Sequence, residues 1–296
     1  GIINLFIYRL RMNHLVKKFC IITLLNIVLN TFLALLLVYY TKSIHYYFIS
    51  LCISNILTII LCLIIVKVDI QGLINTPIKE ITPLLKFSLP LLPASVAMFL
   101  NTAFDRWCIA YYLSINEVAI YSIGSKISSI ATLGVTIIMF VFMPYSMKII
   151  QLDKEKSSLL LERSLRYCSF LFFTGLIILQ TFSPMFISFV APDSYSGANE
   201  VVGFLAVSSI FYGLTYFSTL GSLKKEQSKD YSLSITLGVI LNCILNLILT
   251  PKFGIIGASI STMVGMFVTV IISFFLSHLR FSYSYSYLRL TILFAL

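Results

Sequence analysis

Three charged residues lie inside long apolar stretches of this chain. Asp105 and Arg106 are adjacent within an apolar stretch at 87–112, and Lys126 lies at a matching depth in the next one. A charged side chain at the middle of a membrane helix costs about 2.5 to 3.5 kcal/mol on insertion scales, so such residues usually face a cavity or one another. The three residues therefore predict a polar site between two membrane helices.

Their spacing predicts which of these residues are partners. The connection between the two stretches centres on residues 115–116, so Asp105 and Lys126 are equidistant from it. At 1.5 Å per residue both lie roughly 12 Å inward from the helix ends, near the middle of a hydrocarbon core of about 30 Å. We therefore expect Asp105 and Lys126 to touch. A salt bridge between the helices that only fixes their packing is the alternative explanation of the pair.

Arg106 is then left without an acidic partner, since it projects about 100° around the helix from Asp105. A surplus cation in a low-dielectric cavity is a suitable counter-charge for a phosphate, and the planar guanidinium can hold a phosphate with several donors at once. Arg106 is therefore a candidate for contact with an anionic substrate.

Composition indicates that the elements carrying these residues are membrane helices. Of the 296 residues, 59% are hydrophobic and 11% are charged, with a mean hydropathy of +0.98, whereas a soluble domain is about 25% charged. Windows of about 20 residues predict an all-α, polytopic transmembrane helical bundle. Its eight complete spans are expected near 19–40, 47–66, 87–112, 118–143, 167–190, 199–221, 231–250 and 255–277.

Basic residues alternate between the loops on the two sides of these spans. The loops before the first span and after the second, fourth, sixth and eighth hold 17 of the 21 basic residues, and the alternate loops hold only Lys42 and Lys252. By the positive-inside rule the richer loops are cytoplasmic. The net charge of +10 is thus mostly a topology signal. No nucleic-acid binding is expected, because the charges are scattered over five short loops instead of forming one patch.

The loops predict little structure outside the membrane. External connections such as SINE at 114–117 and TPKFG at 250–254 are only a few residues long. The largest internal loop, 148–166, mixes apolar and charged residues at helical spacing, and we expect it to lie along the membrane surface. A solvated connector explains that pattern equally well.

Motifs of enzyme chemistry and metal binding are absent from the sequence. The six cysteines fall in or at the ends of apolar spans without a CxxC spacing, and the three histidines are isolated in loops. There is no zinc-type cluster, GxSxG motif or Walker A loop. We expect a protein that is not an enzyme and that uses no metal and no cofactor. Any pumping would need an energy source other than nucleotide hydrolysis.

Two segments share the pattern L-N-x-[V/I]-L-N, at 25–30 and at 241–246, each in a span that runs outward from the cytoplasm. The two spans are six helix positions apart, which suggests a parallel duplication into two six-helix lobes. The asparagines of each segment lie four residues apart, on one helix face, and can hydrogen-bond across an interface between helices. Helix packing is the simplest role of these residues: Asn26 and Asn30, and Asn242 and Asn246.

Four motifs occur in an order that resembles the Wzx-type O-antigen flippases. They are FSLPLLP at 87–93, NTAFDR at 101–106, EVAIYSIGSKI at 117–127 and LILTPKFGIIGASIST at 247–262. These flippases form the polysaccharide-transport branch of the superfamily that also holds the multidrug and toxin extruders. The resemblance covers nearly the whole chain, from the end of a fourth helix through a twelfth. It implies a two-lobe, extruder-like fold in the bacterial inner (cytoplasmic) membrane.

The resemblance implies translocation of a polyprenyl-diphosphate-linked oligosaccharide repeat unit, by alternating access through a cationic central cavity, for O-antigen or capsular polysaccharide synthesis. Partners would be this lipid-linked substrate, membrane lipids and the polymerase of the same pathway. Pro90 and Pro93 would bend or break their span at a gate, although Pro90 also fits an ordinary helix start. Trp107 stands where members often have Tyr, and its ring could stack on a sugar or pack against lipid. The substrate-binding residues implied are Asn101, Asp105, Arg106, Trp107, Tyr121 and Lys126.

The chain as a whole, 1–296, would be a fragment of one transporter domain. The expected parts are the end of a truncated helix at about 1–8, the rest of the first lobe and the start of the second at 19–146, the remainder of the second lobe at 147–277, and the start of another truncated helix at 288–296. Two other functions stay open. A multidrug or cation extruder of the same fold would want more membrane carboxylates than Asp105, and a membrane polymerase or glycosyltransferase would usually need a sizeable loop with catalytic acids.

Overall fold

The computed structural model describes residues 15–43, 45–66, 88–220 and 228–280, together with residues 3, 6, 10, 82, 85 and 222. The regular structure of these residues is entirely helical, with long α-helices and two short 3-10 helices. The all-α class predicted from the sequence is therefore confirmed. The chain divides into two compact units, Gly1–Glu80 and Ile81–Leu296.

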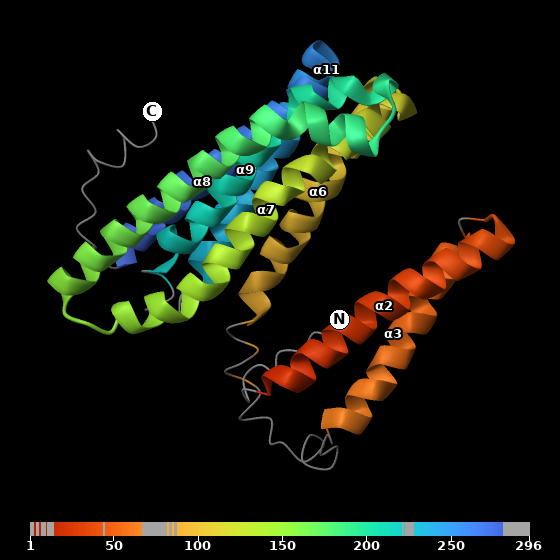
Figure 1. Cartoon of the computed structure of the whole chain (residues 1–296). Coiled ribbons are helices and arrows are strands. Elements are labelled where there is room, and N and C mark those ends of the chain that lie inside the picture. The colour runs from red at the N-terminus through yellow and green to blue at the C-terminus, as the bar shows by residue number, and fades with distance from the viewer. Residues whose placement is uncertain are drawn as a thin grey trace. The chain divides into compact units, whose positions relative to one another are not determined.

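The first unit is a hairpin of two long helices, α2 (Val16–Thr41) and α3 (His45–Val66) (Figure 1). Helix α2 ends at Lys42, which adopts the left-handed conformation with φ 51° and donates its N–H to the Val38 carbonyl at 2.8 Å. A left-handed residue of this kind stops the helix and turns the chain. The turn therefore brings α3 back along α2 within the unit.

The second unit is a bundle whose helices are α6, α7, α8, α9 and α11 (Figure 1). Helix α11 packs against α6 and α9, and α7 packs against α8 and α9. The largest apolar core lies among α7, α8, α9 and α11, where the rings of Phe142 and Phe217 are 4.5 Å apart. The elements in chain order are η1 (Leu89–Leu91), α6 (Leu92–Tyr112), α7 (Ile115–Ile149), α8 (Lys154–Val190), η2 (Asp193–Ala198), α9 (Asn199–Ser218) and α11 (Ser228–Arg280).

All but one of the predicted membrane spans fall in described helices that could cross a membrane. Six of the described helices are long and apolar enough to cross a membrane, and α6, which carries Asp105 and Arg106, is outside that set. Helix α11 has 53 residues, which would measure about 80 Å if it were straight, far more than the roughly 45 Å of a whole bilayer. It therefore contains the last two of the eight predicted spans. The protein is a multi-pass membrane protein.

Helix α11 is broken at Gly254, where φ is 62° and ψ is −142°. This backbone conformation is essentially restricted to glycine, because a Cβ would clash there. The two halves then pack closely together: a Cβ added to Gly265 would lie 2.8 Å from the carbonyl oxygen of Gly238. The turn predicted at 250–254 is confirmed. It reverses the chain, so that the two halves of α11 pack against each other.

The prolines near the start of α6 lie at helix starts. Pro90 falls in the 3-10 helix η1, and Pro93 falls in the first turn of α6. A proline in a first turn costs no hydrogen bond, since that N–H has no partner within the helix. The expected break in the span is thus a change from a 3-10 helix to an α-helix.

Segment 148–166 differs from the surface segment expected from its sequence. Helix α8 begins at Lys154 and continues without a break to Val190, so residues 154–166 form its first turns. The division between the two units falls at Glu80, inside the predicted part 19–146, and the assignment of helices to two lobes stays a prediction. The truncated segment expected at 288–296, and most of that at 1–8, lie outside the described residues.

Candidate functional site

Asp105 lies in the interface of α6 with α11 and is only 3% exposed. Its Oδ2 accepts hydrogen bonds from the Tyr121 hydroxyl of α7 at 2.6 Å and from the Thr262 hydroxyl of α11 at 2.7 Å. Its Oδ1 accepts from the Asn246 amide at 2.8 Å. Burying a carboxylate is costly unless donors replace its water, and three donors do so here. This carboxylate therefore joins three helices at one point.

The asparagines of α11 extend this network along α6. Asn242 donates to Asn101 Oδ1 at 2.9 Å, and Asn246 also donates to Asn242 Oδ1 at 2.6 Å. Thr250 completes the chain by donating to Asn246 Oδ1 at 3.0 Å. The prediction that the asparagines of segment 241–246 bond across a helix interface is thus confirmed. Because Thr262 and Asn246 lie on opposite sides of the Gly254 break, the network needs the fold-back of α11.

The predicted contact between Asp105 and Lys126 is wrong. Lys126 is exposed, whereas Tyr121 and not Lys126 meets the carboxylate from α7. The reason is the start of α7: the Ser114 hydroxyl caps the helix by accepting from the Glu117 N–H at 3.2 Å, so the helix begins at residue 115. The turn therefore centres two residues earlier than expected, which shifts the facing position on α7 by four residues.

Arg106 is half-buried beside this network. Its Nη1 donates to the Thr102 carbonyl at 2.5 Å, and its Nε donates to the Ser122 hydroxyl at 3.4 Å. No ion pair joins Arg106 to an acidic side chain in the part of the chain that the structure describes. A guanidinium has five N–H donors in a fixed fork, and these two contacts occupy two of them. The role of the remaining donors in binding an anionic ligand stays a prediction.

A polar cleft of about 200 Å³ opens next to Arg106, between α6, α7, α9 and α11. Its wall combines the charged and amide groups of α6 with hydroxyl groups from the other helices. Hydroxyls at this density can bind a ligand that is rich in hydrogen-bonding groups. The residues that line the cleft include Asn101, Asp105, Arg106, Tyr121, Ser125, Ser128, Ser129, Thr132, Ser208, Ser209 and Thr262.

Four of the six residues predicted for the substrate site line this cleft: Asn101, Asp105, Arg106 and Tyr121. The other two do not line it. Trp107 is 63% exposed, and Lys126 is exposed as well.

Sequence reasoning missed the hydroxyl residues of α7, α9 and α11. For α7 a signal exists, because Ser125, Ser128, Ser129 and Thr132 follow the i, i+3, i+4, i+7 pattern of one helix face. For Ser208, Ser209 and Thr262 there is none, since they lie far from Thr132 and Asp105 in the chain and reach the cleft only through the packing of α9 and α11.

The described residues contain no group of three or more His, Cys, Asp or Glu side chains that could hold a metal ion. Each of the six cysteines is a free thiol. Asp105 is the acidic side chain at the cleft, and its oxygens face hydroxyl and amide donors instead of further carboxylates. The chemistry available there is hydrogen bonding and charge compensation.

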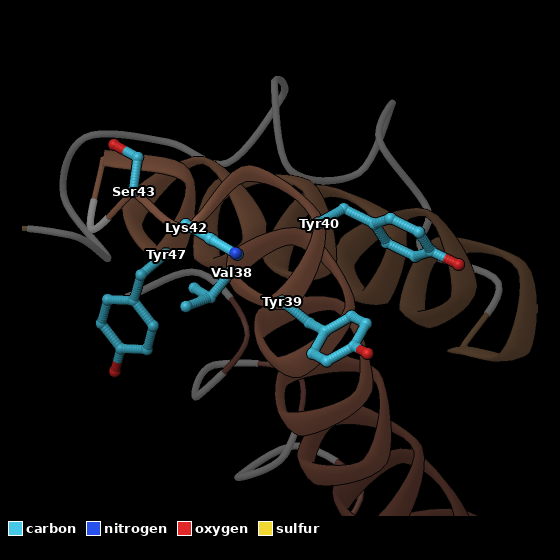
Figure 2. Close-up of a pocket in the computed structure, with 6 residues that line it drawn as sticks. All are labelled: Val38, Tyr39, Tyr40, Lys42, Ser43 and Tyr47. Atoms are coloured by element: carbon cyan, nitrogen blue, oxygen red, sulfur yellow. The ribbon is translucent and has the colours of Figure 1, made fainter.

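A larger hollow of about 960 Å³ lies at the turn between α2 and α3. Figure 2 shows that its tyrosines spread apart, with Tyr40 and Tyr47 pointing to opposite sides of the turn. Tyr39 and Tyr40 are both highly exposed. Rings at a helix end that do not converge are typical of the aromatic belt at a membrane interface. The cleft in the second unit is therefore the better candidate site.

The first two thirds of the chain match a known protein family. Residues 1–200 match the family described as polysaccharide biosynthesis protein. The chain belongs to this family. The matched segment includes the whole of α6 and α7, and thus Asp105, Arg106 and Tyr121. No curated protein and no solved structure matches the chain. Membership in the family gives this membrane protein a role in polysaccharide biosynthesis.

Proposed function

We propose that this protein is a flippase, which translocates a polyprenyl-diphosphate-linked oligosaccharide repeat unit across the bacterial inner membrane for O-antigen or capsular polysaccharide synthesis. Family membership and the multi-pass helical fold support the general role. The observation that carries the proposal is Arg106, a cation without an acidic partner among the described residues, at a polar cleft inside a membrane bundle.

The chemistry of Arg106 suits a diphosphate. A charge in a low-dielectric, partly dry site interacts far more strongly than in water, and a guanidinium can meet two phosphate oxygens at once. The neighbouring Asp105 does not neutralise it by contact, because the carboxylate oxygens are engaged by Tyr121, Asn246 and Thr262. Arg106 is thus free to act as counter-charge while the substrate crosses.

Lys126 supports a cationic cavity outside the cleft. It lies eleven residues after the start of α7, roughly 16 Å along the helix, and it is exposed among apolar neighbours such as Ile130 and Leu133. A lone ammonium at that depth is costly against lipid, so membrane charges of this kind usually face a water-filled cavity. We infer that this face of α7 lines the translocation path.

A cation extruder of the same fold is the second candidate, and the buried Asp105 is the observation in its favour. An extruder for cations would bind its substrate or coupling ion with membrane carboxylates. In this cleft, however, Arg106 stands next to Asp105 and would repel a cationic ligand. The flippase accounts for both residues: Asp105 holds the helices together, and Arg106 meets the anion.

An enzymatic role in the same pathway has less support. A membrane polymerase or glycosyltransferase usually builds its active site on an extramembrane loop. The described connections are short, with only residues 113–114 between α6 and α7 and residues 150–153 between α7 and α8. We therefore include in the proposal that the protein acts as a transporter and not as an enzyme.

The test uses the full-length protein in a strain that lacks its own flippase for the repeat unit. Arg106→Ala should reach the membrane at normal abundance but restore no surface polysaccharide, and Arg106→Lys should restore part of it, because a point charge replaces a fork. Arg163→Ala, which removes an exposed arginine of α8, is the matched control and should restore polysaccharide fully. Normal polysaccharide from a normally abundant Arg106→Ala protein would contradict the proposal.

A further inference from the structure

The geometry of the cleft points to selection among lipid-linked substrates by the charge of one sugar. Resting on the proposed function, we propose that the cleft takes the sugar joined to the diphosphate, accepts a neutral, hydroxyl-rich ring there, and rejects an acidic one such as a hexuronic acid. The residues that make this selection are Ser128 and Ser129 of α7 and Ser208 of α9, together with Asp105.

The size of the cleft suits one ring. Its volume is about 200 Å³, a space that fits a monosaccharide better than an oligosaccharide. Arg106 lies in the wall of the same cleft. If Arg106 holds the diphosphate, the ring that fits beside it is the sugar bonded to that diphosphate, and the rest of the repeat unit stays outside.

The serine hydroxyls present acceptors to this ring. Ser128 donates to the Gly124 carbonyl at 2.7 Å, Ser129 to the Lys126 carbonyl at 2.5 Å and Ser208 to the Leu205 carbonyl at 2.7 Å. A hydroxyl has one donor and two acceptor lone pairs, so these groups keep lone pairs for a ligand after their hydrogens are used. Sugar hydroxyls can donate to them. An ionised carboxylate can only accept hydrogen bonds. Its oxygen lone pairs would face the lone pairs of the serine hydroxyls and repel them.

The charge balance of the cleft favours the same choice. Of the residues that the structure describes in the lining, Arg106 is the basic one and Asp105 the acidic one. The diphosphate already uses the positive charge. An acidic sugar would add an anion near Asp105 without a second cation, and like charges in a site of low dielectric repel strongly. Lys126 is exposed and does not line the cleft, so the lining itself supplies no second cation.

The experiment compares two probes on the purified full-length protein in lipid nanodiscs. Both are radiolabelled farnesyl diphosphates, one bearing N-acetylglucosamine and the other glucuronic acid, and binding is measured at equilibrium. The wild-type protein should bind the neutral probe at least tenfold more tightly. Ser129→Lys adds a second cation at the cleft, and should raise the affinity for the acidic probe at least tenfold. Ser188→Lys, the same change at an exposed serine of α8 away from the cleft, should leave both affinities as they are.

The outcomes separate this inference from the proposed function. If the wild-type protein binds neither probe, the proposed function fails, and the inference fails with it. Equal affinity for the two probes, or preference for the acidic one, overturns the charge selection while leaving the flippase proposal in place. If Ser129→Lys folds and binds the two probes as the wild type does, the cleft does not bind the sugar, and the inference is wrong. Should that variant not fold, the wild-type comparison alone decides.

Discussion

The α2–α3 interface and the α6–α11 interface each contain a pair of asparagines four residues apart, but among the described residues only the second contains a charged side chain. In the first, Asn26 donates to the Thr58 hydroxyl at 3.1 Å, and Asn30 donates to Asn26 at 3.1 Å and accepts from the Ser54 hydroxyl. In the second, the partners across the interface are Asn101 and the Asp105 carboxylate. One interface is therefore neutral, and the other holds a buried acid.

The comparison shows how the Asp105 carboxylate affects the packing of the helices. The α2–α3 interface joins neighbouring helices of a hairpin, and its asparagines are only half-buried. The α6–α11 interface joins residues 141 positions apart in the chain, and its asparagines are fully buried. A carboxylate can accept from several donors at once, so Asp105 gathers α6, α7 and both halves of α11. These hydrogen bonds fix α6 against α7 and α11, and the next residue of α6, Arg106, then lines the cleft.

The largest stability effect is expected at the shared carboxylate. Asp105→Ala leaves the donors of Tyr121, Asn246 and Thr262 without their acceptor, and a buried donor left unsatisfied costs about 1–3 kcal/mol. The expected loss is about 3 kcal/mol, seen as a lower midpoint in thermal unfolding of the detergent-solubilised protein. Asp105→Asn, which keeps the shape and one acceptor oxygen, should lose less. Wild-type stability of Asp105→Ala would mean that the three hydrogen bonds do not hold the helices.

The next effect compares equivalent asparagines of the two interfaces. Asn246→Ala should lower the stability by about 2 kcal/mol, since Asn246 is buried with contacts to Asp105, Asn242 and Thr250. Asn30→Ala should cost less than about 1 kcal/mol, because it is half-buried and its partners are neutral. The same unfolding measurement serves both variants. Equal losses would show that the carboxylate does not distinguish the two interfaces.

A smaller effect is expected within the neutral interface alone. A double-mutant cycle between Asn26→Ala and Thr58→Ala isolates their hydrogen bond. Such bonds between membrane helices average about 0.6 kcal/mol, so the coupling energy should be near that value. A coupling of about 2 kcal/mol or more would mean that the neutral interface is as strong as the charged one.

The smallest effect is expected at Lys126. Because the donors to Asp105 are supplied by other residues, Lys126→Ala should change the stability by no more than about 0.5 kcal/mol, as for surface substitutions away from buried contacts. Lys148→Ala, at the last turn of α7, gives a matched control for removing a lysine from the same helix. A loss of several kcal/mol at Lys126 alone would restore the Asp105–Lys126 pair expected from the sequence.

Periodic and compositional features of the sequence were sufficient to predict the helices and the asparagine contacts. Apolar windows located the helices of the predicted spans, of which α6 alone is outside the described helices that could cross a membrane. The four-residue spacing of Asn242 and Asn246 predicted an interface contact. The spacing of Asn26 and Asn30 predicted the contact with α3 in the same way, which is also confirmed. Such patterns depend only on helix geometry, which is the same in every membrane helix.

The partners of Asp105 could not be predicted in the same way. Its partner on α7 depends on the start of that helix, where Ser114 and Glu117 form the S-x-x-E pattern of a capping box. Reading that pattern as a cap would have moved the facing position from Lys126 to Ser122, next to Tyr121. Thr262 reaches Asp105 only because α11 folds back at Gly254 and packs on α6. The turn was predicted from the sequence, but the packing of α11 on α6 has no local signature there.

The most direct test of the account is translocation itself, measured with the full-length protein in proteoliposomes that contain a fluorescent polyprenyl-diphosphate-linked sugar. Arg106→Ala should slow movement of the lipid to the opposite leaflet at least tenfold, with the unfolding midpoint of the wild type, because Arg106 meets the anion and the Asp105 network holds the helices without it. Arg163→Ala should move the lipid at the wild-type rate. A wild-type rate for Arg106→Ala would contradict the account, since the cleft would then contribute no charge to transport.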